Sequence, residues 1–234
     1  LPAEGNGTGA TPTADAYEWL HRNILFARPQ ADVKTVTVTS PLPGDGKTTT
    51  AAGLAVTLAR RGLKVLLVDA DLRRGTLGSL VQGQGQLGFS DLLAGTAPFH
   101  QVVRTREVGG GHVLHYLPTG ALPPDSTRLL DSPRAAALME WLRERFYLVV
   151  FDTPPINLFA DAAVLAAQTD AVIVVARAGK TEYDALAHAA EQCRRGNLPV
   201  AGVVLNDVDP DRDRDYDGAY RWYEQAKSYY AQAS

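Results

Sequence analysis

A lysine and a threonine that follow a glycine-rich loop are the residues of this sequence best suited to chemistry. The loop reads Ser40-Pro41-Leu42-Pro43-Gly44-Asp45-Gly46-Lys47-Thr48-Thr49, with Pro41 where such loops usually carry their first glycine. Glycines let successive backbone N–H groups face phosphates, the lysine adds a positive charge, and the hydroxyl can ligate magnesium. The sequence therefore predicts a nucleotide phosphate site at Gly44, Asp45, Gly46, Lys47, Thr48 and Thr49.

Three carboxylates follow two other apolar runs. Asp69 and Asp71 come after Val65 to Val68, and Asp152 comes after Tyr147 to Phe151. Residues two apart on a strand share a face, so we expect Asp69 and Asp71 to point at a metal or at an attacking hydroxyl. Ligands of open α/β sheets bind at the carboxyl ends of strands, where Asp152 is expected. Any one of these residues could be a polar strand end, but together with Lys47 they indicate one site.

The elements that position these residues recur along the chain as short apolar runs separated by helical stretches. The expected strands are 35–39, 65–68, 113–117, 147–151, 171–176 and 200–205, and several are apolar at consecutive positions. Strands of that kind are covered by helices on both faces. Helices are expected at 51–61, at 134–145 after the cap Ser132 and Pro133, and at 182–195 after Thr181. The fold class is α/β, a doubly wound and mostly parallel sheet.

Composition limits the classes of protein. The chain has 234 residues, of which 45% are apolar and 8% aromatic, enough for one buried core. A net charge of -3 gives no reason to expect nucleic acid as a partner. Cys193 is the single cysteine, so neither an internal disulfide nor a set of thiolate ligands can form, which fits a reducing cytoplasm. The apolar runs are far shorter than the roughly 20 residues that span a bilayer.

Three segments are expected along the chain. Residues 1–14 are rich in Gly, Thr, Pro and Ala and are predicted to be a linker or the remnant of something longer. Residues 15–207 form the nucleotide-binding domain, and residues 208–234 form a tyrosine-rich tail.

The sequence resembles the bacterial tyrosine kinase family, the cytoplasmic ATP-binding domains of capsule and exopolysaccharide chain-length regulators. Besides the phosphate site, the resemblance rests on residues 88–95, 117–120, 161–163 and 203–206. Cell-division and plasmid-partition ATPases are similar in fold, but their loop carries a signature lysine where this chain has Leu42. The resemblance implies a P-loop NTPase of the deviant Walker type.

The resemblance also implies a role for each site residue. Lys47 would hold the β- and γ-phosphates of ATP, and Thr48 and Asp152 would hold Mg²⁺. Asp69 would ligate the metal or accept the tyrosine proton, with support from Asp71 and Arg73. In related ATPases an asparagine at the position of Asn206 meets the adenine base; a strand-capping asparagine is the alternative.

The family's partners are a membrane-anchored chain-length regulator, fused upstream or separate, and further copies of the kinase. This implies a cytoplasmic protein at the inner face of the plasma membrane that binds ATP and ADP. Family members build a ring through a helix with one glutamate and two arginines at three-residue spacing. Here Asp15, Glu18 and His21 occupy those positions, so the charge pattern is changed and a homo-oligomer is doubtful.

Five of the nine tyrosines lie in the final nineteen residues: Tyr216, Tyr220, Tyr223, Tyr229 and Tyr230. In the family such a cluster is the target of autophosphorylation. Four of them could instead form one stripe of an amphipathic helix. Tyr216 lies between Asp215 and Asp217, which suits an exposed acceptor better than a buried side chain.

Two further patterns are interpreted as coincidental. Residues 213–224 have the spacing of an EF-hand calcium loop, but Pro210 precedes them and Arg214 and Arg221 lie inside. Residues 83–88 spell a dinucleotide fingerprint without a preceding strand.

The sequence favours an ATP-dependent tyrosine autokinase that regulates capsule or exopolysaccharide synthesis and export. Two alternatives stay open. The chain could be an ATP-binding regulatory module of a polysaccharide co-polymerase with little kinase activity, or a partition-type ATPase, which Leu42 disfavours.

Overall fold

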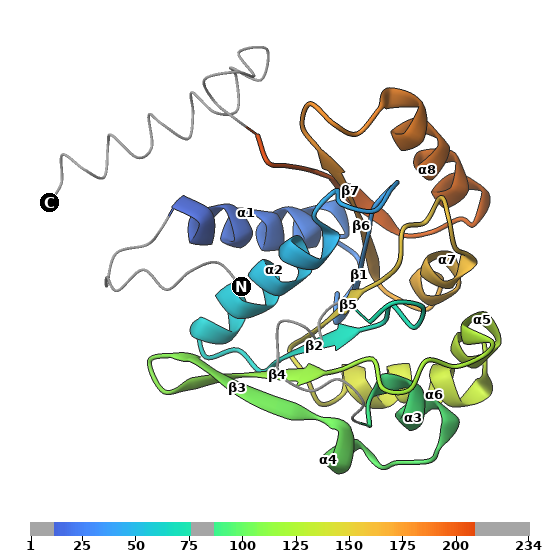
Figure 1. The fold of residues 1–234 in the computed structure, drawn as a ribbon. Helices are drawn as coiled ribbons and strands as arrows, with labels where there is room; N and C mark the ends of the chain where they lie inside the picture. Colours follow the sequence, from blue (N-terminus) through green and yellow to red (C-terminus); the bar gives the residue numbers. More distant parts are fainter. Residues whose placement is uncertain (1–11, 76–86, 209–234) are drawn as a thin grey trace, which may run out of the picture.

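The structure is a computed structural model that describes residues 12–75 and 87–208. In these residues seven strands form one sheet, in the order β3-β4-β2-β5-β1-β6-β7 (Figure 1). The strands are β1 (Thr35–Thr39), β2 (Val65–Asp69), β3 (Arg104–Gly109), β4 (His112–Leu117), β5 (Leu148–Asp152), β6 (Ala171–Arg177) and β7 (Val200–Asn206). All neighbouring pairs are parallel except β3 with β4. The predicted fold class is confirmed.

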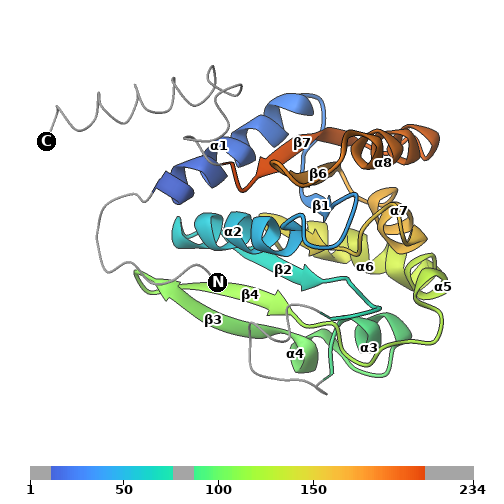
Figure 2. The ribbon, with the colours of Figure 1, turned by 45° about the horizontal axis from the view of Figure 1, so that its top comes forward.

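Helices cover both faces of the sheet (Figures 1 and 2). Helices α1 (Pro12–Ala27) and α2 (Lys47–Arg60) lie on one face. The other face carries α3 (Phe89–Ala94), α4 (Phe99–Val102), α5 (Ser126–Leu130), α6 (Pro133–Arg143), α7 (Ala160–Ala166) and α8 (Tyr183–Arg195). None of the helices in the described ranges combines the length and the apolar character needed to cross a membrane.

The central strands are buried on both faces because alternate side chains enter two different cores. Strand β5 illustrates this: Val150 packs in the cluster that contains Leu54 of α2, whereas Phe151 packs in the opposite cluster with Phe89 and Met139. Strands β1, β2 and β5 are buried at every position. This is why the sequence shows consecutive apolar residues in place of alternation.

The expected strands and helices were found with small shifts at their ends. Ser132 caps α6 by accepting from the Ala135 amide at 3.2 Å, as predicted, with proline in the first turn. Helix α6 ends at Arg143, two residues before the expected end. Helix α1 begins at Pro12, inside the segment expected to be a linker.

One strand was not predicted. Strand β3 has the sequence Arg-Thr-Arg-Glu-Val-Gly, is mostly exposed, and pairs antiparallel with β4 at the edge of the sheet. The hairpin turns through Gly109, Gly110 and Gly111, all with positive φ. An edge strand with two arginines and a glutamate lacks the apolar signal used to recognise a strand.

The core prediction concerns Leu54 on α2, which is fully buried against the sheet. Leu54→Ala should lower the free energy of unfolding by about 2–5 kcal/mol, because the lost methyl groups leave a cavity. Chemical denaturation measures this change. Leu158→Ala, at a leucine that is 49% exposed, is the control and should cost less than about 1 kcal/mol. Equal losses in both variants would contradict the packing described here.

Candidate functional site

The glycine-rich loop connects β1 to α2 at the carboxyl edge of the sheet. Gly44 and Gly46 have φ values of 89° and 97°, which a side chain would strain. Gly46 is the N-cap of α2 and provides no side-chain cap, so the first amides of this 14-residue helix face the loop without a capping side chain. Such a helix N-terminus attracts phosphate through its amides and its dipole.

Lys47 turns inward over this loop and is only 8% exposed. Its Nζ lies 3.9 Å from Asp71 Oδ2, 4.0 Å from Asp152 Oδ1, and 3.4 Å from the Thr48 hydroxyl. Asp69 and Asp152 are register partners at the ends of β2 and β5, and the Ala70 amide donates to the Asp152 carbonyl at 2.8 Å. The sequence-predicted lysine and carboxylates therefore meet at one place.

Asp71 lies at the site, but the backbone that positions it is not the strand that was expected. Strand β2 ends at Asp69, so Asp71 belongs to the following turn and does not share a strand face with it. Its Oδ1 accepts from the amides of Arg73 at 3.3 Å and Arg74 at 3.1 Å, which leaves Oδ2 toward Lys47. The turn, and not strand periodicity, orients this carboxylate.

Burial dominates the electrostatics of Asp152. Desolvation raises the pKa of its carboxyl to about 7, against the lowering effects of the Lys47 charge and of a hydrogen bond with Thr48; the Asp69 and Asp71 charges add to the rise. One ammonium group faces several buried carboxylates, so the site has an excess of negative charge. A divalent cation would relieve that excess.

A contact that the sequence did not reveal holds the predicted loop residue Asp45 in place. Asp45 is buried, and its carboxylate accepts from the Leu42 amide at 2.9 Å and from the Thr181 hydroxyl at 2.8 Å. Thr181 was expected to cap α8, but the N-cap is Glu182, and Thr181 instead ties the phosphate loop to the end of β6. The sequence offered a threonine before a helix, and only the tertiary fold shows its partner.

Asn206, at the end of β7, also contacts the loop. Its side-chain amide donates to the Asp45 carbonyl at 3.1 Å. A Cβ at Gly46 would lie 1.9 Å from the Asn206 amide nitrogen, so glycine is required for this approach. The contact of Asn206 with an adenine base stays a prediction.

The Arg73 side chain extends to α7. Its guanidinium binds Asp161 through Nε at 2.6 Å and Nη2 at 3.2 Å and lies 4.6 Å from the centre of the Phe159 ring. Its support of catalysis stays a prediction.

No group of three or more His, Cys, Asp or Glu side chains in residues 12–75 and 87–208 is arranged to hold a metal ion by itself. Magnesium in phosphate-transfer sites is bound through one or two carboxylates together with substrate phosphates and waters. The predicted ligands Thr48, Asp69 and Asp152 fit a site of that kind, which needs the nucleotide to complete it.

The tyrosine cluster and the calcium-like loop lie outside the described residues, as does most of the 83–88 glycine pattern.

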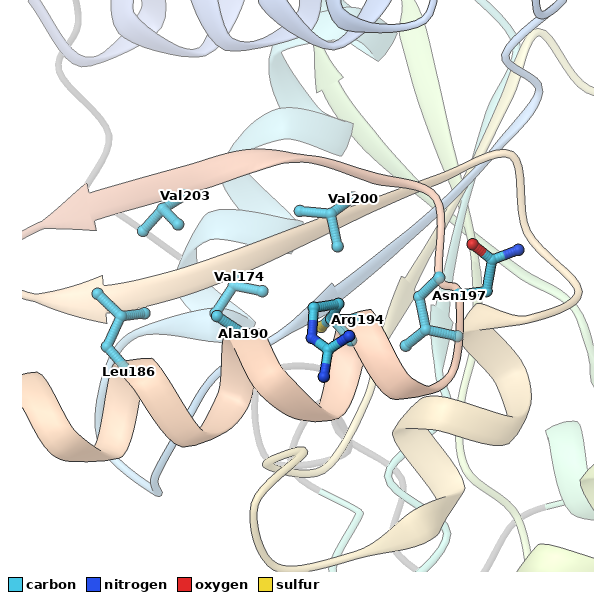
Figure 3. Close-up of a pocket in the computed structure, with 9 residues that line it drawn as sticks. Val174, Leu186, Ala190, Arg194, Asn197, Val200 and Val203 are labelled. Carbon is cyan, nitrogen blue, oxygen red and sulfur yellow. The ribbon is translucent and has the colours of Figure 1, made fainter.

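An apolar pocket of about 400 Å³ lies between α8 and the strands β6 and β7 (Figure 3). None of its lining residues belongs to the phosphate loop or to the aspartate cluster. They are Val174, Leu186, Ala190, Cys193, Arg194, Asn197, Leu198, Val200 and Val203. The pocket has no carboxylate to hold a metal, so the phosphate loop is the candidate active site.

Comparison with known proteins agrees with this geometry. The model of the CobQ/CobB/MinD/ParA nucleotide binding domain matches residues 36–229. The fold and the site define a P-loop nucleotide-binding domain. The tyrosine-protein kinase YwqD of Bacillus subtilis (strain 168) is 34% identical over 200 residues, which cover 82% of this chain and 80% of YwqD. This chain belongs to the bacterial tyrosine-protein kinase family.

Other relatives agree with this assignment. EpsB of Ralstonia solanacearum is 36% identical over 203 residues, covering 87% of this chain; the chain spans only 27% of the length of EpsB. The kinase domain of Escherichia coli tyrosine kinase ETK superposes with a TM-score of 0.77 at 30% identity, covering 83% of this chain and 75% of that domain. MinD from Pyrococcus horikoshii OT3, in complex with Mg-ADP, gives a TM-score of 0.61 at 23% identity over 78% of this chain and 76% of MinD, a likeness of fold alone.

The raised pKa of Asp152 predicts a pH-dependent stability. A carboxyl whose pKa is higher in the folded state than its ordinary 3.8 stabilises the fold when protonated, and this stabilisation is lost as pH rises through about 7. Asp152→Asn, which cannot ionise, should therefore raise the melting temperature of the ligand-free protein more at pH 8 than at pH 5. Thermal denaturation at both pH values measures this. A melting temperature that the substitution lowers equally at both pH values would contradict the pKa assignment.

Proposed function

We propose that this chain is an ATP-dependent protein-tyrosine autokinase that phosphorylates its own C-terminal tyrosine cluster and regulates capsule or exopolysaccharide synthesis and export. The observation that carries the proposal is the convergence of Lys47, Asp71 and Asp152 beside the N-terminus of α2. Membership in the tyrosine-protein kinase family selects tyrosine as the acceptor. We further propose that it works at the inner face of the plasma membrane, with a membrane-anchored chain-length regulator as its partner.

The residues present fit ATP and Mg²⁺. The amides at the start of α2 and the Lys47 ammonium suit a triphosphate, and the buried carboxylates suit a divalent cation. When bound, magnesium would neutralise charge on the phosphate oxygens. Thr48 and Asp152 are hydrogen-bonded to each other and could share one ion, with Asp69 beside them on the neighbouring strand.

The chain's own residues would then divide the work of phosphoryl transfer, which depends on positioning and on charge. Lys47 binds the β- and γ-phosphate oxygens and moves from its present carboxylate partners to do so. Asp69 is the candidate to accept the proton of the tyrosine hydroxyl, because it lies beside Asp152 and is buried. Asp71 orients Lys47 from the turn after β2.

The position of Asn206, shortly before the tyrosine cluster in the sequence, supports the proposal that these tyrosines accept the phosphate. The Asn206 side chain touches the phosphate loop, so the last described residues of the domain lie close to the site. Tyr216 follows Asn206 by ten residues, and a fully extended chain of ten residues reaches at most about 35 Å. That length is enough for Tyr216 to reach the phosphate site of its own chain.

The activity is tested by incubating the purified protein with Mg²⁺ and ATP and locating phosphate by mass spectrometry. We expect phosphotyrosine among Tyr216, Tyr220, Tyr223, Tyr229 and Tyr230, and at least about a 100-fold loss in Lys47→Met, because phosphate positioning is lost. Lys34→Met is the matched control: Lys34 precedes β1 at the opposite end of the sheet and should be dispensable. Release of free phosphate without phosphotyrosine would instead identify an ATPase.

A second candidate is a regulatory module that binds ATP but phosphorylates little, and α1 provides the observation that favours it. His21 is 5% exposed and packs beside the Tyr147 ring, and burial, with the Arg61 and Arg22 charges, lowers the pKa of its imidazole. Glu18 lies 4.0 Å from Arg61 of the same chain. Two of the three positions that build the family's ring are therefore engaged within this chain.

We accordingly expect no charge-paired ring in solution. Sedimentation velocity at 0.05 M and 0.5 M salt should give the same monomeric mass, since Glu18 and His21 are engaged within the chain and would leave no ring-forming ion pairs at these two positions for salt to screen. A ring that forms at low salt and dissociates at high salt would contradict this and would remove the argument for the regulatory module.

A further inference from the structure

Asp161 is a buried carboxylate that the proposed phosphate chemistry does not use. It lies in the first turn of α7 with no exposed surface. Its Oδ2 accepts from Arg73 Nε at 2.6 Å and from the Ser126 hydroxyl at 2.8 Å; its Oδ1 accepts from Arg73 Nη2 at 3.2 Å and from the Thr127 hydroxyl at 2.5 Å. One carboxylate thus joins the turn after β2, helix α5 and helix α7.

These donors keep Asp161 ionised in spite of its burial. Desolvation by itself would raise the pKa of the carboxyl, but the hydrogen bonds from Arg73, Thr127 and Ser126 outweigh it and lower the pKa. A buried carboxylate that loses a charged partner is left with an uncompensated charge. The arrangement is therefore sensitive to either end of the Arg73–Asp161 pair.

Arg73 is the link from Asp161 to the phosphate site. Its side chain is 41% exposed but is held by the bidentate pair and by the Phe159 ring. Its backbone amide, with that of Arg74, donates to Asp71 Oδ1. Asp71 Oδ2 in turn faces Lys47 Nζ at 3.9 Å. The same short turn is thus fixed at one side by Asp161 and presents a carboxylate to the lysine at the other.

We propose that Asp161 is a positioning residue for phosphoryl transfer: by anchoring Arg73 it fixes the turn that holds Asp71 against Lys47. Asp161 need not touch the nucleotide. The kinetic test of this proposal rests on the proposed kinase function. The contacts of Asp161 with Arg73 and of Asp71 with Lys47 are present in the ligand-free protein and can be tested without activity.

The test compares Asp161→Asn with a matched control, Asp170→Asn. Asp170 is also a partly buried carboxylate that binds an arginine, Arg143 at 3.1 Å, and the Thr35 hydroxyl at 2.7 Å, but it lies at the opposite end of the sheet, before β6. Both variants should lose stability. Only Asp161→Asn should lower kcat, by about 10- to 100-fold, with less than about a threefold change in the Kd for ATP, because small misplacements affect the transition state most.

A double-mutant cycle separates positioning through Arg73 from an independent effect. Arg73→Gln should reproduce most of the loss in kcat, and Arg73→Gln combined with Asp161→Asn should lose no more than about twofold beyond the larger single loss. Arg73→Lys, which keeps one charged bond, should fall between Arg73→Gln and the wild type. The proposal would be overturned if the fold losses in kcat of the two single variants multiplied in the double variant. It would also be overturned if Asp161→Asn had the same kcat as Asp170→Asn.

Hydrogen exchange in the ligand-free protein gives a readout that does not depend on activity. The Arg73 and Arg74 amides should exchange at least about tenfold faster in Asp161→Asn than in the wild type. In Asp170→Asn their exchange rates should equal those of the wild type. If the wild type forms no phosphotyrosine, this measurement still decides the role of Asp161, and the kinase function alone fails. Should Asp161→Asn not fold, Arg73→Gln carries the same test, and unchanged exchange of the Arg74 amide there would overturn the proposal.

Discussion

The structure depends on one electrostatic arrangement: the ammonium group of Lys47 lies beside buried carboxylates that it cannot neutralise alone. Each carboxylate comes from a different position on the sheet edge or the turn after it, so the arrangement exists only when β2, β5 and the phosphate loop are all in place. The free-energy cost of burying these charges is offset by the apolar cores on the two faces of the sheet. The folded protein thereby presents a place where phosphate oxygens and a cation are both favoured.

The phosphate loop is held from two sides in a way that complements this arrangement. Asp45 connects it to Thr181 after β6, and Asn206 connects it to the end of β7. Since β6 and β7 are distant from the loop in the sequence, the loop is held in this conformation only when these strands have joined the sheet. The glycines permit the required φ angles, and these distant side chains select one conformation among those that glycine allows.

The sequence sufficed for the central strands, their coverage by helices on both faces and the phosphate loop, because apolar runs and a glycine–lysine–threonine motif are local signals. It failed where the local signal is weak or where the decisive partner is distant. Strand β3 is polar and lacks an apolar run, and Asp71 follows the strand on which it was expected. Thr181 precedes a helix in the sequence, but its partner Asp45 is 136 residues away. Asp161 stood within a motif of the family, but nothing in its neighbourhood in the sequence reveals that Arg73 is its partner, 88 residues away.

The contact between Asn206 and the phosphate loop links two parts of the protein that the sequence keeps apart. The side chain that closes over Gly46 belongs to the last residue of the sheet, from which the tyrosine-bearing segment departs. A side chain at position 46 would collide with the Asn206 amide, so the glycine of the loop and the asparagine at the end of β7 depend on each other, and a change at either residue alters the fit of the other.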